Sequence, residues 1–335
     1  MNQCVIPEGY KSILTIYQTQ SAIGRLKRIF EDNLSMALNL HRVSAPLFVE
    51  PRTGLNDNLT GIERPVEFDV PGTQQSAEIV HSLAKWKRMA LHKYGFSPGE
   101  GLYTDMNAIR RDEVLDNTHS IYVDQWDWEV VITKEQRSEE FLKQTVRRIV
   151  EAIYVSGERL RWDYPELPLS IKRDVTFVTA QELEDLYPNL SPEEREDEFT
   201  RKHKTVFVMK IGGKLMSGKR HGSRAPDYDD WNLNGDIIFW HDLLGRALEI
   251  SSMGIRVDVP ALDAQLTEAG CDCRRELDFH RALLAGDLPL TIGGGIGQSR
   301  LCMLLMAKAH IGEVQVSVWD DATIRACESA GIKLL

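Results

Sequence analysis

The sequence predicts an α+β fold whose neighbouring strands pair antiparallel. Strand patterns at 101–109 and 119–129 are joined by one short polar loop, and those at 236–240 and 247–256 also look like an antiparallel pair. Apolar residues recur with helical spacing at 19–40 and again at 83–92. No repeat, low-complexity segment or obvious linker interrupts the 335 residues, which favours one continuous unit with a mainly helical insertion around 138–204.

Composition excludes several classes of protein. The net charge of −10 argues against nucleic acid as the main partner, because phosphate backbones require a basic surface. No apolar run reaches the roughly 20 residues that span a bilayer, and the N-terminus lacks the apolar region of a signal peptide. The five cysteines, an odd number, are typical of reduced thiols. We therefore expect a cytoplasmic protein that binds neither membranes nor nucleic acid.

The N-terminal third contains few local signals of function. After the helix at 19–40, the strand pattern at 41–49 includes Pro46, which cannot donate to a strand ladder and indicates a sheet edge or a subunit boundary. Asp57 opens a turn, and its local sequence assigns it no role. The helix at 83–92 carries Lys85, Lys87 and Arg88, a pattern typical of a solvated face.

The strand at 119–129 is the most informative stretch in the middle of the chain. Its alternation places Gln125 and Asp127 on the same face as Ile121 and Val123. Polar groups beside apolar ones need a partner, and a ligand would provide one. Arg110 ends the preceding strand and is expected to lie close to them across the hairpin.

The segment after residue 138 combines helices with further strands. Thr179 with Glu182 and Ser191 with Glu194 each predict a capping box at a helix N-terminus. In the strand pair at 236–240 and 247–256, Asp236 and Glu249 each stand beside apolar residues. Such a pair suits a shared divalent cation, but the spacing fits two surface acids equally well.

Four glycines follow near the C-terminus, at positions 293, 294, 295 and 297, before an apolar helical pattern that begins at 298. We expect them at a strand-to-helix junction and not within a strand, because glycine loses the most backbone freedom on folding. Arg300 falls in the first turns of the helix, and this combination suits a phosphate-bearing ligand. A plain glycine-rich turn explains the glycines equally well. The stretch matches neither a Walker loop nor a dinucleotide fingerprint.

Several long motifs follow one another along the chain, at 81–88, 99–104, 122–129, 224–231, 251–256 and 291–300. Together, and in this order, they resemble the aspartate–ammonia ligases, the ammonia-dependent asparagine synthetases. The resemblance implies the fold of a class II aminoacyl-tRNA synthetase catalytic domain, a mixed and mostly antiparallel sheet flanked by helices, in a homodimer. It also places the strand with Pro46 at the dimer interface, Arg110 on the α-phosphate, and Gly295, Gly297 and Arg300 on the nucleotide.

The implied reaction uses ATP to activate L-aspartate as β-aspartyl-AMP with release of pyrophosphate, after which ammonia displaces AMP and gives L-asparagine. The resemblance implies a role in catalysis for five residues, Arg110, Arg300, Asp57, Gln125 and Asp127, and substrate binding by Ser82, Lys87, Asp229, Ser251, Ser252 and Arg256. It also implies that the nucleotide is bound by Gly293, Gly294, Gly295 and Gly297 together with Arg110 and Arg300. Asp236 and Glu249 are implied as the Mg²⁺ ligands. We assign the deprotonation of ammonium to Asp57 as a hypothesis.

Two alternatives carry the same fold. A tRNA synthetase for aspartate or asparagine would need an anticodon-binding domain, for which the length leaves no room. A non-catalytic paralogue would have lost the arginines or the acidic pair, and all of these residues are present. The chain also departs from some relatives in having only Asn232 between Trp231 and Leu233, where they carry a longer loop.

Overall fold

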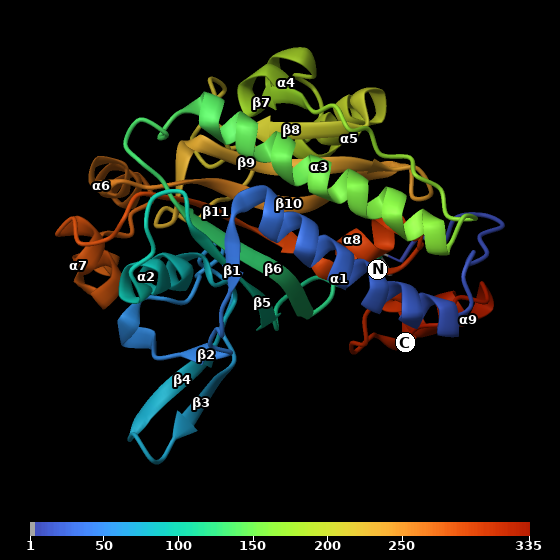
Figure 1. Ribbon diagram of the computed structural model, residues 1–335, viewed down its shortest axis with the longest axis horizontal. Helices are drawn as coiled ribbons and strands as arrows, with labels where there is room; N and C mark the ends of the chain where they lie inside the picture. The colour runs from blue at the N-terminus through green and yellow to red at the C-terminus, as the bar shows by residue number, and fades with distance from the viewer. Residues whose placement is uncertain (1–3) are drawn as a thin grey trace.

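The computed structural model describes residues 4–335 and is built around one large sheet (Figure 1). Its eight strands follow the order β1 (Leu40–Arg42), β5 (Gly101–Ile109), β6 (Tyr122–Val131), β11 (Thr291–Gly297), β10 (Arg246–Arg256), β9 (Asp229–His241), β8 (Thr205–Met209) and β7 (Thr176–Thr179). Only the outermost pairs, β1 with β5 and β7 with β8, run parallel. The predicted mixed, mostly antiparallel sheet is confirmed.

Helices cover both faces of this sheet. They are α1 (Ile16–Leu38), α2 (Ala84–Tyr94), α3 (Glu139–Asp163), α4 (Ala180–Leu186), α5 (Pro192–His203), α6 (Val259–Glu268), α7 (Asp278–Leu284), α8 (Gln298–Leu305) and α9 (Asp321–Ser329), with 3₁₀ turns η1 (Pro51–Thr53), η2 (Asp272–Glu276) and η3 (Ile311–Glu313). The largest apolar core joins α1, α3 and α8 to one face of the sheet. Trp126 and Trp128 of β6 are fully buried in that core, which leaves the alternate residues of β6 for the opposite face.

The strand predicted at 41–49 is wrong as a single element. The chain forms β1, leaves the large sheet around Pro46, and then forms β2 (Phe48–Val49) in a second sheet of order β2, β4 (Gln75–Ile79), β3 (Glu67–Val70). β1 is an edge strand of the large sheet and β2 an edge strand of the second, and Pro46 lies in the connection between them, where no strand ladder needs its N–H group. Figure 1 shows the second sheet extending away from the body of the molecule.

The segment 138–204 contains α3, α4 and α5 together with β7. Both predicted capping boxes are confirmed. The Thr179 and Ser191 side chains accept from the amide of the third residue of α4 and α5, and the side chains of these third residues, Glu182 and Glu194, accept from the backbone amides of the two capping residues. The segment is also integrated with the rest of the chain: β7 extends the large sheet, and α3 packs along α1. That the segment 138–204 is an insertion into the catalytic unit stays a prediction.

Helix α2 contradicts the expectation of a solvated cationic face. Lys85, Lys87 and Arg88 are each at most 2% exposed. Arg88 donates to the carbonyls of Pro289 and Val257, at 2.8 and 2.7 Å. The helix therefore lies against the open face of the sheet with its cations turned inward, which periodicity of apolar residues alone could not reveal.

His241, at the end of β9, gives the fold an acid-sensitive point. Burial lowers the pKa of its ring from 6.5 to about 4, so between these values the unfolded chain binds a proton that the folded chain does not. Stability therefore falls as pH falls, by about 2 kcal/mol at pH 5 for this group. In urea unfolding at pH 7 and pH 5, His241→Gln should shrink the difference between the two free energies by about that amount. An unchanged difference would contradict it.

Candidate active site

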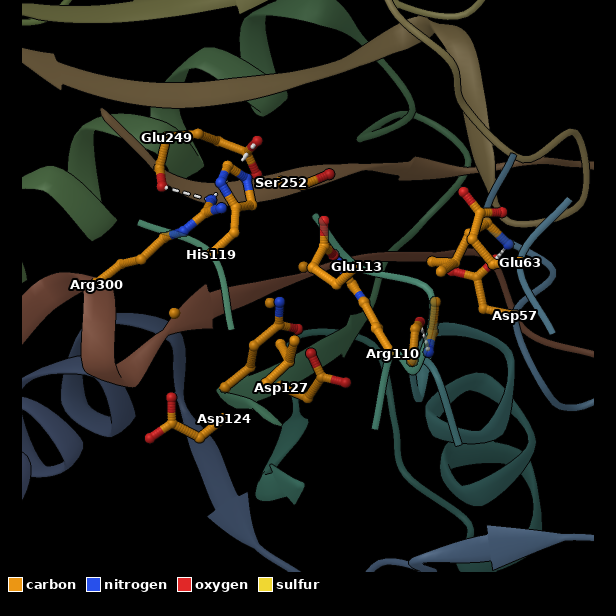
Figure 2. Close-up of a pocket in the computed structure, with 18 of the residues that line it drawn as sticks. Asp57, Glu63, Arg110, Glu113, His119, Asp124, Asp127, Glu249, Ser252 and Arg300 are labelled. Carbon is orange, nitrogen blue, oxygen red and sulfur yellow. Dashed lines mark hydrogen bonds and ion pairs between the residues drawn. The ribbon is translucent and has the colours of Figure 1, made fainter. Parts of the chain in front are cut away.

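A cavity of about 470 Å³ opens on the face of the sheet opposite the largest core. Its floor is formed by β6, β11 and β10, and its walls by α2, the turn after η1, the loop between β5 and β6, and the loop before β9. Arg110 and Arg300 both line it, although 190 positions separate them in the sequence. Figure 2 shows Arg300 beside Glu249 on one side of this space, and Arg110 nearer to Asp57 on the other.

The glycines form part of the floor, and the expectation that they avoid a strand interior is wrong. They lie in β11, which pairs with β6 on one side and β10 on the other. A Cβ atom on Gly293 would lie 1.9 Å from a carboxylate oxygen of Glu129, and one on Gly295 would lie 2.3 Å from Gln125. Glycine is required here because polar side chains of β6 lie across the strand, not because the backbone is unusual.

A network of buried charges continues across this floor. The Lys87 ammonium donates to the carbonyl of Gly294 at 2.8 Å and lies 3.4 Å from Asp127 and 3.9 Å from Glu129. Arg256 pairs with Glu129 at 2.7 Å and also with Asp229. Burial would raise the pKa of Glu129, but Arg256 and Lys87 outweigh it and hold that pKa below its usual value. The Glu129 carboxylate is therefore held ionised between Lys87 and Arg256, and the network fixes the positions of these side chains for a charged ligand.

The two cavity arginines keep donors available for such a ligand. Arg300 donates through Nε to the carbonyl of Thr118 at 3.2 Å and through Nη1 to that of Glu249 at 3.1 Å. Arg110 makes one long bond, from Nη2 to the carbonyl of His81 at 3.5 Å, and its buried Nε has no partner. An anion with several oxygens, such as a phosphate, would accept hydrogen bonds from the remaining N–H groups of both guanidinium groups.

Asp57 lies in the cavity wall as a buried, ordered turn residue. Its backbone amide is bound by the Asn56 side chain at 2.9 Å, and its Oδ1 accepts from the amide of Leu59 at 2.9 Å. Asp57 is only 4% exposed, and it lines the cavity. The turn thus fixes the direction of the carboxylate.

Most of the predicted site residues lie together, and three do not line the cavity. The lining includes Arg110, Arg300, Asp57, Gln125, Asp127, Ser82, Lys87, Asp229, Ser252, Arg256, Gly294, Gly295, Gly297 and Glu249. Ser251 is buried on the other side of β10, because neighbouring strand residues face opposite ways. Gly293 is covered by Glu129 and Arg256, and Asp236 lies behind Arg224. Ser251 therefore faces away from any substrate that is bound in the cavity.

The predicted metal pair occupies an acidic corner next to the cavity. Asp236 is ion-paired with Arg224, and Glu249 is largely exposed with Arg300 at 4.0 Å. Burial, followed by the nearby charges of Glu249 and Glu196, raises the pKa of Asp236 to about 7 despite the arginine. A hard divalent cation held by the two carboxylates would favour the ionised form of Asp236 that burial disfavours.

Sequence reasoning did not assign several residues that the cavity contains. Tyr228 and Arg224 come from the loop before β9, and His119 comes from the loop after β5. Glu129 does not line the cavity, but it pairs with Lys87 and Arg256 beside it, and the sequence pattern alone assigned it no role. A signal was present, because Glu129 continues the alternation of Gln125 and Asp127. The expected short connection after Trp231 is a continuous stretch of β9.

The fold defines the class of the protein. The asparaginyl-tRNA synthetase of Entamoeba histolytica, solved with asparaginyl-adenylate, superposes with a TM-score of 0.65 at 13% identity, covering 90% of this chain and 66% of that chain. The corresponding enzyme of Pyrococcus horikoshii gives 0.61 at 15% identity, covering 88% and 68%. This architecture is the catalytic domain of a class II aminoacyl-tRNA synthetase, as the sequence predicted.

Closer relatives identify the family within that class. The family model described as aspartate-ammonia ligase matches residues 17–331. Aspartate–ammonia ligases of Ruminiclostridium cellulolyticum and Lactobacillus johnsonii are 58% and 57% identical, over 100% and 99% of this chain and 100% and 99% of their own lengths. The chain belongs to the aspartate–ammonia ligase family. The prediction of a ligase that forms asparagine from aspartate and ammonia is confirmed.

Among residues 4–335, the structure contains no helix with the length and apolar content needed to cross a membrane.

Proposed function

We propose that the cavity between Arg110 and Arg300 is where this chain uses ATP to adenylate L-aspartate and then transfers the aspartyl group to ammonia. The observation that carries the proposal is the convergence of these two guanidinium groups on one space floored by fixed acids and a buried lysine. The first step brings together two anions, a carboxylate and a triphosphate, and it is slow unless cations neutralise them. The reaction releases pyrophosphate in this step and AMP in the next.

Each arginine has its own part in adenylation. Arg110 binds the α-phosphate, where its partnerless Nε and its weakly held Nη2 can donate to two oxygens. Arg300 lies with the nucleotide, on the side of the cavity that Gly297 and Glu249 form. Gly294 and Gly295 line the same space between the two arginines.

Aspartate lies over β6 in this proposal. The Lys87 ammonium attracts the substrate carboxylates, and Asp127 and Asp229 lie near the position of the substrate's α-ammonium group. Asp57, in the cavity wall, takes the proton from ammonium in the second step. Gln125, Ser82 and Ser252 supply neutral hydrogen bonds. Arg256 acts through Glu129 and Asp229, holding the two carboxylates in place.

Mg²⁺ binds at the acidic corner of Asp236 and Glu249, where it would help to neutralise the phosphates of ATP. The nearness of the Glu249 carboxylate to the buried carboxylate of Asp236 supports this assignment. Glu249→Gln should therefore raise the Mg²⁺ concentration that gives half the maximal rate, by about tenfold. If titration with Mg²⁺ gives the same midpoint for both proteins, another residue holds the ion.

One assay tests the overall function. AMP release from ATP should require aspartate and ammonium together and should proceed without tRNA. Aspartate-dependent exchange of pyrophosphate into ATP, with no response to ammonium, would indicate an amino-acid-activating enzyme of another kind. Binding of nucleotide or aspartate without either activity would indicate a non-catalytic sensor.

The active form of the chain is a homodimer in this proposal, and α1 contributes to the interface. Ile16, Tyr17 and Met36 of that helix are 44%, 82% and 76% exposed, a degree of exposure that suits apolar contact with a second chain. Sedimentation equilibrium of the wild type should give twice the mass of the chain, and a monomer at all concentrations would contradict the proposal.

A further inference from the structure

Two cysteines and a histidine meet where the beginning of the described chain packs against its end. The Sγ atoms of Cys4 and Cys327 and a ring nitrogen of His310 lie within 4.8 Å of one another. Cys327 and His310 are completely buried, and Cys4 is partly exposed. Ile6 and Tyr10 pack against Ile332 around them, so this cluster has a hydrophobic frame of its own, separate from the catalytic cavity.

A thiophilic metal is the first ligand to consider for such a trio, and the histidine argues against it. His310 Nδ1 accepts from the amide of Gly312 at 3.0 Å, so the neutral ring carries its proton on Nε2. Neither nitrogen then has a lone pair to give to a metal. Ligation would break the bond that caps η3, which leaves the two thiols as the reactive part of the cluster.

We propose that Cys4 and Cys327 form a redox pair that closes to a disulfide in the presence of a low-molecular-weight disulfide such as oxidised glutathione. The two sulfurs already lie within 4.8 Å of each other, and closing the bond requires them to move together to the separation of a disulfide. Cys4, which is partly exposed, is the one that a small oxidant can reach.

The hydrogen bond between the two thiols orders their roles. This bond lowers the pKa of Cys4 and, by the same contact, raises the pKa of Cys327. Cys4 is therefore the attacking thiolate, and Cys327 is the resolving thiol.

The exchange proceeds in two balanced steps. The Cys4 thiolate attacks one sulfur of the oxidant, forming a mixed disulfide and releasing one thiolate that takes up a proton. Cys327 then loses its proton, attacks the Cys4 sulfur and expels the second thiolate, which is protonated in turn. The protein gives up two electrons and two protons, and the oxidant becomes two thiols.

The disulfide would fix a segment that braces the catalytic loop. Next to Cys4, the backbone of Val5 exchanges two hydrogen bonds with the Asn117 side chain, at 2.7 and 2.8 Å. The residue after Asn117 is Thr118, whose carbonyl accepts from Arg300 at 3.2 Å. Oxidation would therefore add a covalent anchor to the segment that supports the Arg300 side of the cavity, and reduction would remove that anchor.

The test is made on the full-length protein, reduced and then exposed to oxidised glutathione. Free thiols should fall from five to three, and digestion without reductant should yield one linked peptide pair that contains Cys4 and Cys327. Dithiothreitol should restore all five thiols. The oxidised form should unfold at a temperature a few degrees higher, because the link constrains the unfolded chain. The control Cys273→Ser, at an exposed cysteine, should still form the link, whereas Cys4→Ser and Cys327→Ser should not.

Three results would overturn the proposal. Glutathione could remain on Cys4 with no linked pair, or the link could join Cys271 to Cys273 instead. The protein could also be isolated with one zinc ion per chain that Cys4→Ser loses, which would establish a metal site. None of these measurements depends on catalytic activity, so failure here leaves the proposed function untouched.

Discussion

Replacing Arg110 with alanine is expected to lower the rate of aspartate-dependent pyrophosphate exchange about 10²- to 10³-fold, because a donor aimed at the reacting phosphate is lost. Arg110 is suited to this task, since among residues 4–335 its buried Nε finds no hydrogen-bond partner and its Nη2 donates to the His81 carbonyl at a long 3.5 Å. Its loss removes little that stabilises the folded chain. The drop should therefore appear in kcat, with an unfolding midpoint close to that of the wild type.

A neighbouring arginine provides the matched control. Arg111 is exposed and does not line the cavity, so Arg111→Ala should leave exchange within about twofold of the wild type. Arg110→Lys should recover only part of the rate, because a lysine cannot donate to two oxygens at once. Equal losses in Arg110→Ala and Arg111→Ala would mean that net charge, and not position, matters at this loop.

Local patterns predicted the sheet and the faces of its central strands well. The alternation of β6 separated Trp126 and Trp128, which pack in the core, from Gln125 and Asp127, which line the cavity. Such patterns work because a strand with one apolar and one polar face has a single way to lie on a core. The same alternation in β10 distinguishes Ser252, which lines the cavity, from Ser251, which is buried on the other face of the strand.

Long-range contacts explain what the sequence could not reveal. Lys87 is indistinguishable from a surface lysine until α2 is packed onto β11, where the Gly294 carbonyl and Asp127 surround its ammonium. Gly293 and Gly295 of β11 are explained by Glu129 and Gln125 of another strand, and Gly294 by Met253 of β10. Their spacing is compatible with a turn or a phosphate loop, and the structural reason is the volume of side chains far away in the sequence.

Asp57 separates the two halves of the reaction, and Asp57→Asn should therefore retain pyrophosphate exchange while asparagine formation falls about 10²- to 10⁴-fold. Ammonium is the main species near neutral pH, so an acceptor must take a proton as the nitrogen attacks the acyl carbon. The carboxylate of Asp57 is held by the Leu59 amide at the cavity wall, and asparagine would preserve its shape and remove its basicity.

Both half-reactions must be measured on the same preparation, with Asp69→Asn as the control, since Asp69 is an exposed aspartate of β3 outside the cavity. The control should match the wild type in exchange and in synthesis. If exchange in Asp57→Asn falls as far as synthesis, the carboxylate binds the substrate's α-ammonium group instead. A higher ammonium concentration or a higher pH should then fail to restore the rate, whereas a lost proton acceptor is partly replaced when more free ammonia is supplied.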